Sequence, residues 1–467
     1  MIQLRKIESF WKISAVRILT FTEQSANEER QEVALNDKQL NNTIGEAGKQ
    51  ERTSLRQINK ARQLRLIPLI FAELVLCLSV FAQPQKIIDI HKMNPAGHLA
   101  DEYSYMSQPY SFYYFHNMDQ LNLRTDWIKK ADRTYPLREP VRERTFEYTF
   151  RGQRYSLDEY FKRNFVTGFL VLRDDQIIME KYFHEADRNS RFVSQSLSKS
   201  IVSILVGAAV EEGAIKSIED PVATYLPYLS GSGYRNVTVK NLLQMSTGVR
   251  YSEDYGDPKS EAALLGAALL TGNPSFKDYA QSIQPTSTPP GTKFEYQSVN
   301  TQVLGLLLEK VTGKRLNEYT QEKLWKKIGS QSDAFFYESP KQPDTCAFAC
   351  FNATLRDYAR IGLMMLQGGA LGEQRVVSSK WVKDSTTPDA PYLKPRPGGL
   401  GYAYQWWIPY GKDEVYMGLG IYGQCIYVNP NRHVVIVQTS AWPEPESMPL
   451  ELEQGAVFEK IAGEIVP

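Results

Sequence analysis

Histidine and cysteine are scarce in this chain of 467 residues, which contains five histidines and four cysteines. The histidines are scattered, and no H-x-x-x-H or C-x-x-C spacing occurs, so the sequence gives no support for a metal site. The net charge is only +1 and no tract of clustered basic residues appears, which argues against a general nucleic-acid-binding protein. No pattern indicates a cofactor. A content of 42% hydrophobic and 23% charged residues is typical of a globular protein.

The first 82 residues do not show the pattern of a folded domain. Residues 1–63 are mostly polar and charged without sustained periodicity, which predicts a disordered segment. Residues 64–82 then combine a basic flank, a short apolar run and the small residue Ala82. This pattern predicts a secretory signal peptide cleaved before Gln83, or an uncleaved membrane anchor, and therefore an exported protein that is periplasmic or secreted. A core helix without a targeting role is the third interpretation.

The rest of the chain is predicted to hold an N-terminal extension, residues 83–150, and one large domain, residues 151–467. The extension is rich in Tyr, Phe and Arg with scattered prolines, which is typical of a segment wrapped over a domain.

Two of the cysteines lie close together in the sequence. Cys346 and Cys350 are near enough for a small-loop disulfide in an oxidising compartment. The equally weighted alternative is three buried thiols, with Cys425 as the third.

The order of hydrophobic patterns predicts an α/β (α+β) fold. Two β-type runs, 166–172 and 176–183, form a predicted hairpin. Helical patterns follow, with Thr238 as the N-cap of one helix and a loosely patterned long connection, 246–291, of the kind that often forms a lid or binding loop. Further helices are predicted at 301–311, 317–327 and 354–367. The last third returns to β-type runs and a final helix, at 402–409, 414–417, 425–429, 433–440 and 450–465. We therefore expect an antiparallel sheet of N- and C-terminal strands, flanked by helices, with an inserted all-helical region over roughly 200–375.

A serine and a lysine stand one helical turn apart in the stretch from Phe192 to Gly213. The side chains of Ser196 and Lys199 can lie on the same helix face, and the helix start favours developing negative charge on the serine. The chain has no G-x-S-x-G elbow and no histidine in a recognisable catalytic context. A lysine kept neutral by burial can act as the base instead. A capped core helix is the structural alternative for this motif taken alone.

Three motifs together resemble a known superfamily. Ser196-Leu197-Ser198-Lys199 matches the S-x-x-K motif of the serine β-lactamase and penicillin-binding-protein superfamily. Tyr296-Gln297-Ser298 is similar to the second motif of its class C β-lactamase, carboxylesterase and nylon-oligomer-hydrolase branch, and residues 418–424 are similar to the third, strand motif. Within this branch the chain most resembles 6-aminohexanoate-dimer-hydrolase-type serine hydrolases. Three further phrases support the resemblance: 218–222, 242–248 and 352–360.

The resemblance implies a role for each matching residue. Ser196 would attack a carbonyl and form an acyl-enzyme, Lys199 would accept or relay its proton, and Tyr296 would act as general base and then as general acid. The backbone N–H groups of Ser196 and Ile421 would form the oxyanion hole. Substrate contacts are predicted for five more residues: Ser298, Gly418, Gly420, Tyr422 and Tyr255.

Departures from the superfamily's motifs bear on the substrate. Ser298 replaces the asparagine typical of β-lactamases, and Gly418 stands where they hold a lysine that binds the substrate carboxylate. This favours a small ester or amide, linear amide oligomers included. A β-lactamase or D-alanyl-peptide hydrolase is the alternative, and a catalytically inactive binding protein of the same fold is the third hypothesis. The predicted partner is a small molecule, with membrane association only through residues 64–82, and the sequence indicates no oligomeric state.

Overall fold

The computed structural model describes residues 106–121, 123–140, 144–341 and 344–465. The predictions for 1–63 and 64–82 lie outside the described residues, as does the beginning of the predicted extension. Within the described part of the chain, no helix has both the length and the apolar composition needed to cross a membrane.

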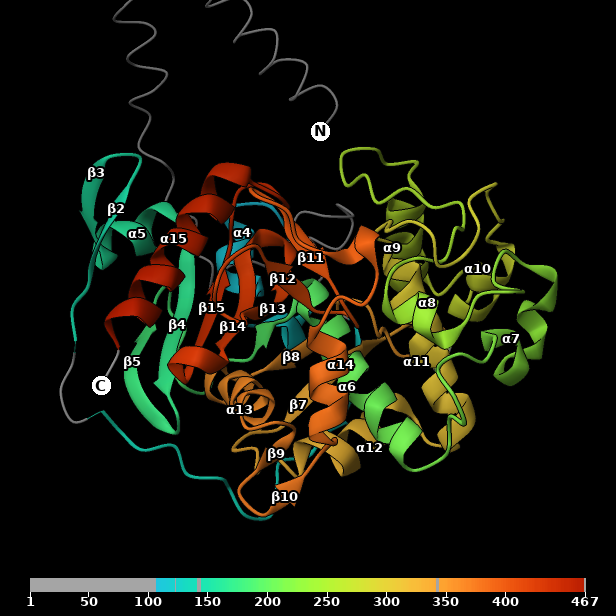
Figure 1. Cartoon of the computed structure of the whole chain (residues 1–467), viewed down its shortest axis with the longest axis horizontal. Helices are drawn as coiled ribbons and strands as arrows, with labels where there is room; N and C mark the ends of the chain where they lie inside the picture. The colour runs from blue at the N-terminus through green and yellow to red at the C-terminus, as the bar shows by residue number, and fades with distance from the viewer. Residues whose placement is uncertain (1–105, 122, 141–143, 342–343, 466–467) are drawn as a thin grey trace, which may run out of the picture. The chain divides into compact units, whose positions relative to one another are not determined.

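The main sheet has seven antiparallel strands in the order β11-β12-β13-β14-β15-β4-β5. Strands β4 and β5 form the predicted hairpin, and β4 pairs with β15 from Val434↔Arg173 onwards. The sheet therefore joins strands from both ends of the domain, which confirms that prediction (Figure 1). The strands are β4 (Val166–Arg173), β5 (Gln176–Tyr182), β11 (Leu400–Tyr402), β12 (Trp407–Pro409), β13 (Tyr416–Gly420), β14 (Gln424–Asn429) and β15 (Val434–Ser440).

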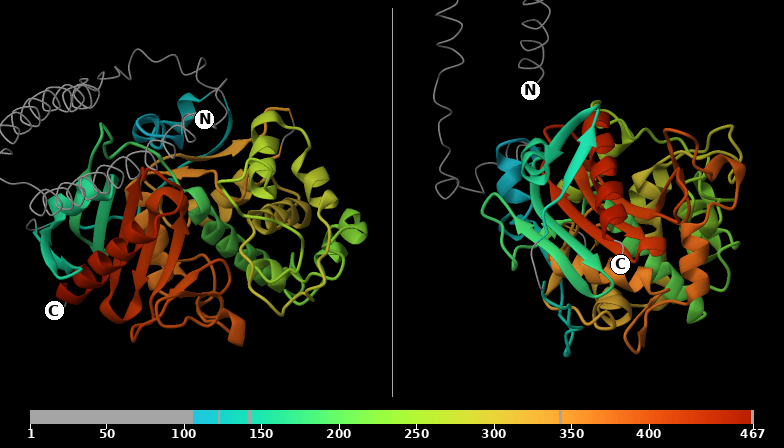
Figure 2. Two further views of the ribbon diagram at one scale, coloured as in Figure 1. Left: turned by 90° about the horizontal axis from the view of Figure 1, so that it is seen from above. Right: turned by 60° about the vertical axis from the view of Figure 1, so that its left-hand side comes forward.

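Helices cover both faces of this sheet. The long helix α15 (Met448–Glu464) lies across one face beside the hairpin of β2 (Glu147–Phe150) and β3 (Gln153–Ser156), as Figure 2 shows. A core of aromatic and aliphatic side chains fills this interface, with Phe458 of α15 against Phe169 of β4. The helices α5 (Leu157–Arg163) and α13 (Leu355–Leu366) complete the covering, α13 against β14 and β15. Buried apolar area on both faces holds the sheet in place.

The region between β5 and β11 is mainly but not entirely helical, so the prediction of an all-helical insertion is wrong. A second sheet with the order β1-β7-β8-β6 runs through it. Strand β7, Ala-Phe-Phe-Tyr-Glu, is buried at every position, and a short run buried on both faces lacks the alternation that marks a strand. The strands are β1 (Arg124–Ile128), β6 (Phe192–Val193), β7 (Ala334–Glu338) and β8 (Phe351–Ala353). Strand β1, from the predicted extension, pairs with β7.

The predicted connection 246–291 contains two helices that the sequence reading missed. Helix α9 begins after Ser260, whose hydroxyl accepts from the N–H of Ala263, and ends at Gly272 in the left-handed conformation. Its Ala- and Leu-rich sequence lacks a strong polar face, so periodicity gave little signal. The predicted N-cap at Thr238 is confirmed by its capping box. Besides α13, the α-helices between β5 and β11 are α6 (Ser198–Glu211), α7 (Val222–Tyr225), α8 (Val239–Leu243), α9 (Glu261–Thr271), α10 (Phe276–Ser282), α11 (Ser298–Thr312), α12 (Leu316–Thr320) and α14 (Ser379–Thr386).

The predicted strand 402–409 is divided into β11 and β12 by a turn around Gln405. Gln405 has a φ of 63° and its side chain ties two helices together. Its amide donates to the carbonyls of Leu242 and Leu243, at 2.9 and 3.0 Å, and its Oε1 accepts from Thr301 Oγ1 at 2.7 Å. Its backbone carbonyl accepts from Ser200 Oγ of α6 at 2.7 Å. This turn anchors the helices that carry the candidate site to the edge of the sheet.

Candidate active site

Ser196 lies in a tight turn between β6 and α6. The turn is a single 3₁₀ turn over residues 195–197, and α6 begins at Ser198, two residues later than the serine. Gln195, directly before it, has a φ of 46°, a backbone conformation that is uncommon for residues other than glycine. Backbone conformations of this kind cluster at functional sites, where the surrounding structure enforces them. The Ser196 side chain is 8% exposed and stands at the start of the helix.

Lys199 is buried directly beside this serine. Its Nζ lies 2.8 Å from Ser196 Oγ and donates to the Phe348 carbonyl at 2.9 Å. The side chain is only 1% exposed. Burial lowers the pKa of Lys199 to about 8, and the negative charge of Glu253 opposes this shift. An amine with a pKa in this range can be neutral at a moderate pH and can then accept a proton.

Tyr296 reaches the same serine from the residues that precede α11. Its hydroxyl is hydrogen-bonded to Ser196, and its ring stacks on Trp407 with centroids 5.3 Å apart. Lys199 Nζ lies 5.1 Å from the centre of the tyrosine ring. Burial and the charge of Glu253 raise the pKa of Tyr296. The structure thus brings together Ser196, Lys199 and Tyr296, which are 100 residues apart in the sequence at their extremes.

Strand β13 approaches the serine turn more closely than a side chain would allow. A Cβ placed on Gly420 would lie 2.4 Å from the Ser194 carbonyl oxygen, and one on Gly418 would lie 3.0 Å from Ser200 Oγ. Glycine at these two positions lets the strand backbone pack against the start of α6. Ile421, which follows the strand directly, is predicted to supply a backbone N–H to the oxyanion hole. The strand contact holds this residue at the end of β13 beside the serine turn.

Three of the residues predicted to contact the substrate make contacts within the protein. The Ser298 hydroxyl donates to Glu253, and its backbone N–H donates to Glu253 Oε2 at 2.8 Å. Tyr422 is 7% exposed, has a φ of 62° and packs edge-on against Phe115 with ring centroids 5.3 Å apart. Tyr255 is partly buried and donates to Glu253 Oε1 at 2.7 Å. The substrate contacts of these three residues stay a prediction.

A family model described as Beta-lactamase matches residues 163–457, a stretch that contains all three motifs. The chain belongs to the beta-lactamase family. The mixed fold with an antiparallel sheet and the arrangement of Ser196, Lys199 and Tyr296 are both found within the matched residues.

This beta-lactamase-family chain is similar to a curated hydrolase and shares its fold with solved hydrolase structures. The 6-aminohexanoate-dimer hydrolase of Paenarthrobacter ureafaciens is 33% identical over 306 residues, which cover 62% of this chain and 76% of that protein. A solved structure from Bacillus anthracis named "Putative 6-aminohexanoate-dimer hydrolase" is 25% identical, with a TM-score of 0.71 over 81% of this chain and 99% of that one. A family VIII carboxylesterase shares the fold, with a TM-score of 0.51 at 17% identity over 65% of this chain and 96% of that one.

Residues 346–350 form a loop that backs the site of this beta-lactamase-family chain. Cys346 and Cys350 are joined by a disulfide, with Cα atoms 5.6 Å apart, and Cys425 is a buried free thiol. The first of the two predicted cysteine arrangements is therefore correct. Between the cysteines, Ala347 O accepts from Ser198 Oγ at 2.8 Å and Phe348 O accepts from Lys199. The loop supplies backbone acceptors to the first turn of α6.

Sequence reasoning missed Glu253 and Phe348 as parts of this site. Phe348 acts through its carbonyl, which any residue type can provide, so no sequence signal could have marked it. Glu253 lies two residues before Tyr255 in the predicted lid or binding connection. A carboxylate at this place in the sequence is a weak indication of a role in the site.

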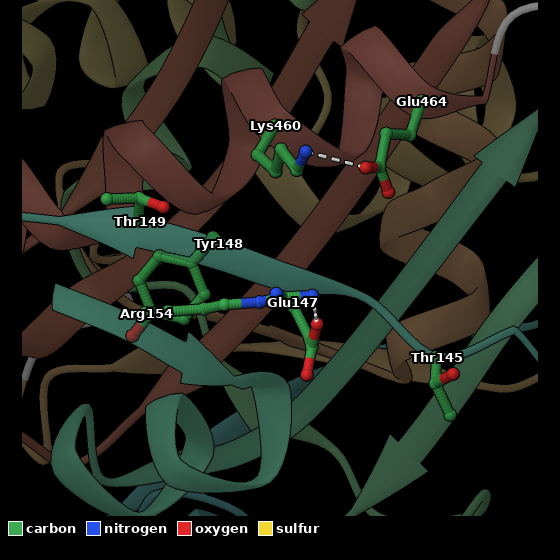
Figure 3. Close-up of a pocket in the computed structure, with 7 residues that line it drawn as sticks. All are labelled: Thr145, Glu147, Tyr148, Thr149, Arg154, Lys460 and Glu464. Carbon is green, nitrogen blue, oxygen red and sulfur yellow. Dashed lines mark hydrogen bonds and ion pairs between the residues drawn. The ribbon is translucent and has the colours of Figure 1, made fainter.

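A polar cavity elsewhere on the domain does not share residues with the site. It lies between the β2–β3 hairpin and the end of α15, and Figure 3 shows its lining. Its charged side chains are paired with each other, Arg154 with Glu147 and Lys460 with Glu464. Among the residues that the structure describes, no group of three or more His, Cys, Asp or Glu side chains is arranged to hold a metal ion.

Proposed function

We propose that this chain is a serine hydrolase that cleaves a small ester or amide through an acyl-enzyme on Ser196. The observation that carries the proposal is the 2.8 Å distance between Lys199 Nζ and Ser196 Oγ, in a site where the lysine is shielded from water. A serine becomes an effective nucleophile when an adjacent neutral base can take its proton. The relationship to an amide-oligomer hydrolase supports the same class of substrate.

The proposed reaction has two steps. In the first, Ser196 Oγ attacks the carbonyl carbon of the substrate while its proton passes to Lys199, directly or through Tyr296. The negative charge on the carbonyl oxygen is stabilised by the backbone N–H groups of Ser196 and Ile421. Tyr296 then donates a proton to the leaving alcohol or amine as its bond to the carbonyl carbon breaks, and it takes up the proton held by Lys199. In the second step, water attacks the acyl-enzyme and gives up a proton to Lys199, which returns a proton to Ser196 Oγ as the bond between Ser196 and the acyl group breaks and the acid leaves.

The substrate is proposed to lack the carboxylate that a penicillin or a D-alanyl peptide carries beside its scissile bond. Gly418 provides no cation at the strand position, and a side chain there would point at Ser200 and Leu197. An uncompensated carboxylate next to a buried site is costly to desolvate.

The test is labelling of the full-length protein with a serine-directed fluorophosphonate, together with hydrolysis of p-nitrophenyl esters, short linear amides and nitrocefin. We expect labelling and ester or amide turnover in the wild type and neither in Ser196→Ala, with an unchanged circular dichroism spectrum. Labelling that persists in Ser196→Ala would sink the assignment. Nitrocefin turnover faster than that of the esters would establish the β-lactamase alternative, and no activity at all would favour the binding-protein hypothesis.

We also propose that the protein is exported. The disulfide between Cys346 and Cys350 supports this, because such bonds persist mainly in oxidising compartments. Cell fractionation of the source organism with thiol alkylation before lysis tests the proposal. Recovery in the cytoplasm with both thiols alkylated would contradict it.

A further inference from the structure

Three hydrogen-bond donors converge on the carboxylate of Glu253, in the connection between α8 and α9. Oε2 accepts from the Ser298 N–H at 2.8 Å, and Oε1 accepts from the Tyr255 hydroxyl at 2.7 Å and from the Ser298 hydroxyl. The Ser298 N–H belongs to the first residue of α11, at the positive end of a helix of 15 residues. Hydrogen bonds from such groups to a carboxylate are stronger than those between neutral partners.

The segment 247–253, which includes Glu253, also binds the residue immediately before α11. Gln297 Oε1 accepts from Thr247 Oγ1 at 2.9 Å, and its Nε2 donates to the Val249 carbonyl at 3.0 Å. Both residues that follow Tyr296 are thus bound to the segment that contains Glu253. Tyr296 directly precedes these two residues, so their contacts help to fix its backbone, while its ring stacks on Trp407.

We propose that Glu253 is a positioning residue of the Ser196 site, which helps to fix Tyr296 for proton transfer by joining residues 253–255 to the start of α11. This inference rests on the proposed function. On this proposal, Ser298, the last residue of the second motif, serves to bind Glu253. The connection 246–291 then contributes to the site through Glu253.

The charge of Glu253 also acts on the two proton-transfer groups. It raises the pKa of Lys199 against the effect of burial, and it raises the pKa of Tyr296. The effect of the negative charge of Glu253 and the effect of its hydrogen bonds can therefore be separated by two substitutions of this residue. Other titratable groups within its electrostatic reach are Tyr251, Tyr255, Tyr279, Tyr402 and Glu446.

The experiment compares Glu253→Gln, which removes the charge and keeps the length, with Glu253→Asp, which keeps the charge and shortens the reach. Asp254→Asn is the matched control. This neighbouring exposed carboxylate accepts from the Gly256 N–H at 2.8 Å and, among the residues that the structure describes, bonds to no residue of the site. We expect kcat for a p-nitrophenyl ester to fall by about 10- to 100-fold in both Glu253 variants, as misplacement of a proton-transfer group does. The control should stay within about twofold, and KM should change less than kcat.

The pH profile separates charge from position. In Glu253→Gln alone, the rise of kcat/KM with pH should move to lower pH, because the negative charge that raises the pKa of Lys199 is removed. Glu253→Asp should keep the wild-type midpoint. A kcat in both Glu253 variants equal to that of Asp254→Asn would overturn the inference.

Amide hydrogen exchange tests the same contacts without reference to activity. Exchange over residues 251–257 and at Ser298 should be faster in both Glu253 variants and unchanged in Asp254→Asn. Unchanged exchange in the Glu253 variants would overturn the inference even in an active enzyme. If the wild type hydrolyses nothing while exchange responds as expected, the proposed function fails and the positioning contacts stand.

Discussion

Replacing Lys199 by methionine should stabilise the protein at neutral pH while it abolishes hydrolysis. The folded state lowers the pKa of this lysine from 10.5 to about 8 by burial. A tenfold change in a protonation equilibrium corresponds to about 1.4 kcal/mol, so the charged lysine destabilises the folded state by roughly 3 kcal/mol below pH 8. Methionine removes this cost, but it leaves the Phe348 carbonyl without its donor, which costs about 1–3 kcal/mol.

The pH dependence of the free energy of unfolding tests this prediction more strictly than the net change in stability at one pH. Between pH 8 and 10.5 the unfolded chain binds a proton that folded Lys199 has released, so the stability contributed by this site rises with pH through that window. The methionine variant lacks this dependence. Its free energy of unfolding relative to wild type should therefore fall by roughly 3 kcal/mol from pH 7 to pH 10.5.

The assay is urea unfolding at a series of pH values, followed by tryptophan fluorescence. The buried residues Trp325, Trp406 and Trp442 report on the core of the domain. Raised pKa values of the tyrosines affect both proteins alike and largely cancel in the difference. A constant difference between the two unfolding free energies across this pH range would refute the argument that burial sets the pKa of Lys199.

Three further predictions concern catalysis and the strand contact. The kcat/KM of the wild type should rise with pH with a midpoint near 8, because neutral Lys199 is the proposed proton acceptor; a midpoint near 6 in the pH–rate profile would exclude this role. Tyr296→Phe should lower kcat by about 10²- to 10⁴-fold in the ester assay with little change in melting temperature, and an unchanged kcat would remove it from proton transfer. Gly420→Ala places a methyl group 2.4 Å from Ser194 O, so it should lower both kcat and, by about 1–3 kcal/mol, the free energy of unfolding. Gly463→Ala is the control, because outside the adjoining backbone of α15 its new methyl group meets no atom within 4 Å. Equal values in the two variants would contradict the strand contact.

Local patterns predicted the parts of the fold that local physics determines. The β4–β5 hairpin, the helix after Ser196 and the last strands follow from periodicity and turn residues within short windows. The phrase 352–360, which resembles the family, contains a buried residue that ties several segments together. Its Asp357 is fully buried, accepts the N–H groups of Gln331 and Ser332 at 2.7 and 3.0 Å, and pairs with Arg360 at 2.8 Å.

Contacts between distant segments were beyond the reach of such patterns. The four-stranded sheet brings β1, β6, β7 and β8 together from three separate regions, and β6 and β8 are two and three residues long. Strands this short carry almost no periodicity. The resemblance to the superfamily's motifs predicted Tyr296 as a partner of Ser196, but the bond between Glu253 and Ser298 depends on how a loop folds back onto a helix. Tertiary packing decides such contacts, and the sequence of either segment alone does not encode them.

The pairing of β4 with β15 bears on how the protein is made. These two central strands are separated by more than half of the chain, and β13, which packs against the serine turn, lies on the late side of that gap. The sheet cannot close on the ribosome until nearly all of the domain has been synthesised, and such long-range pairings form slowly. The serine turn is therefore synthesised early, but β13, which packs against it, is synthesised only near the end of the domain. A nascent or truncated chain that ends before β13 should hold Ser196 and Lys199 without the strand that completes their surroundings.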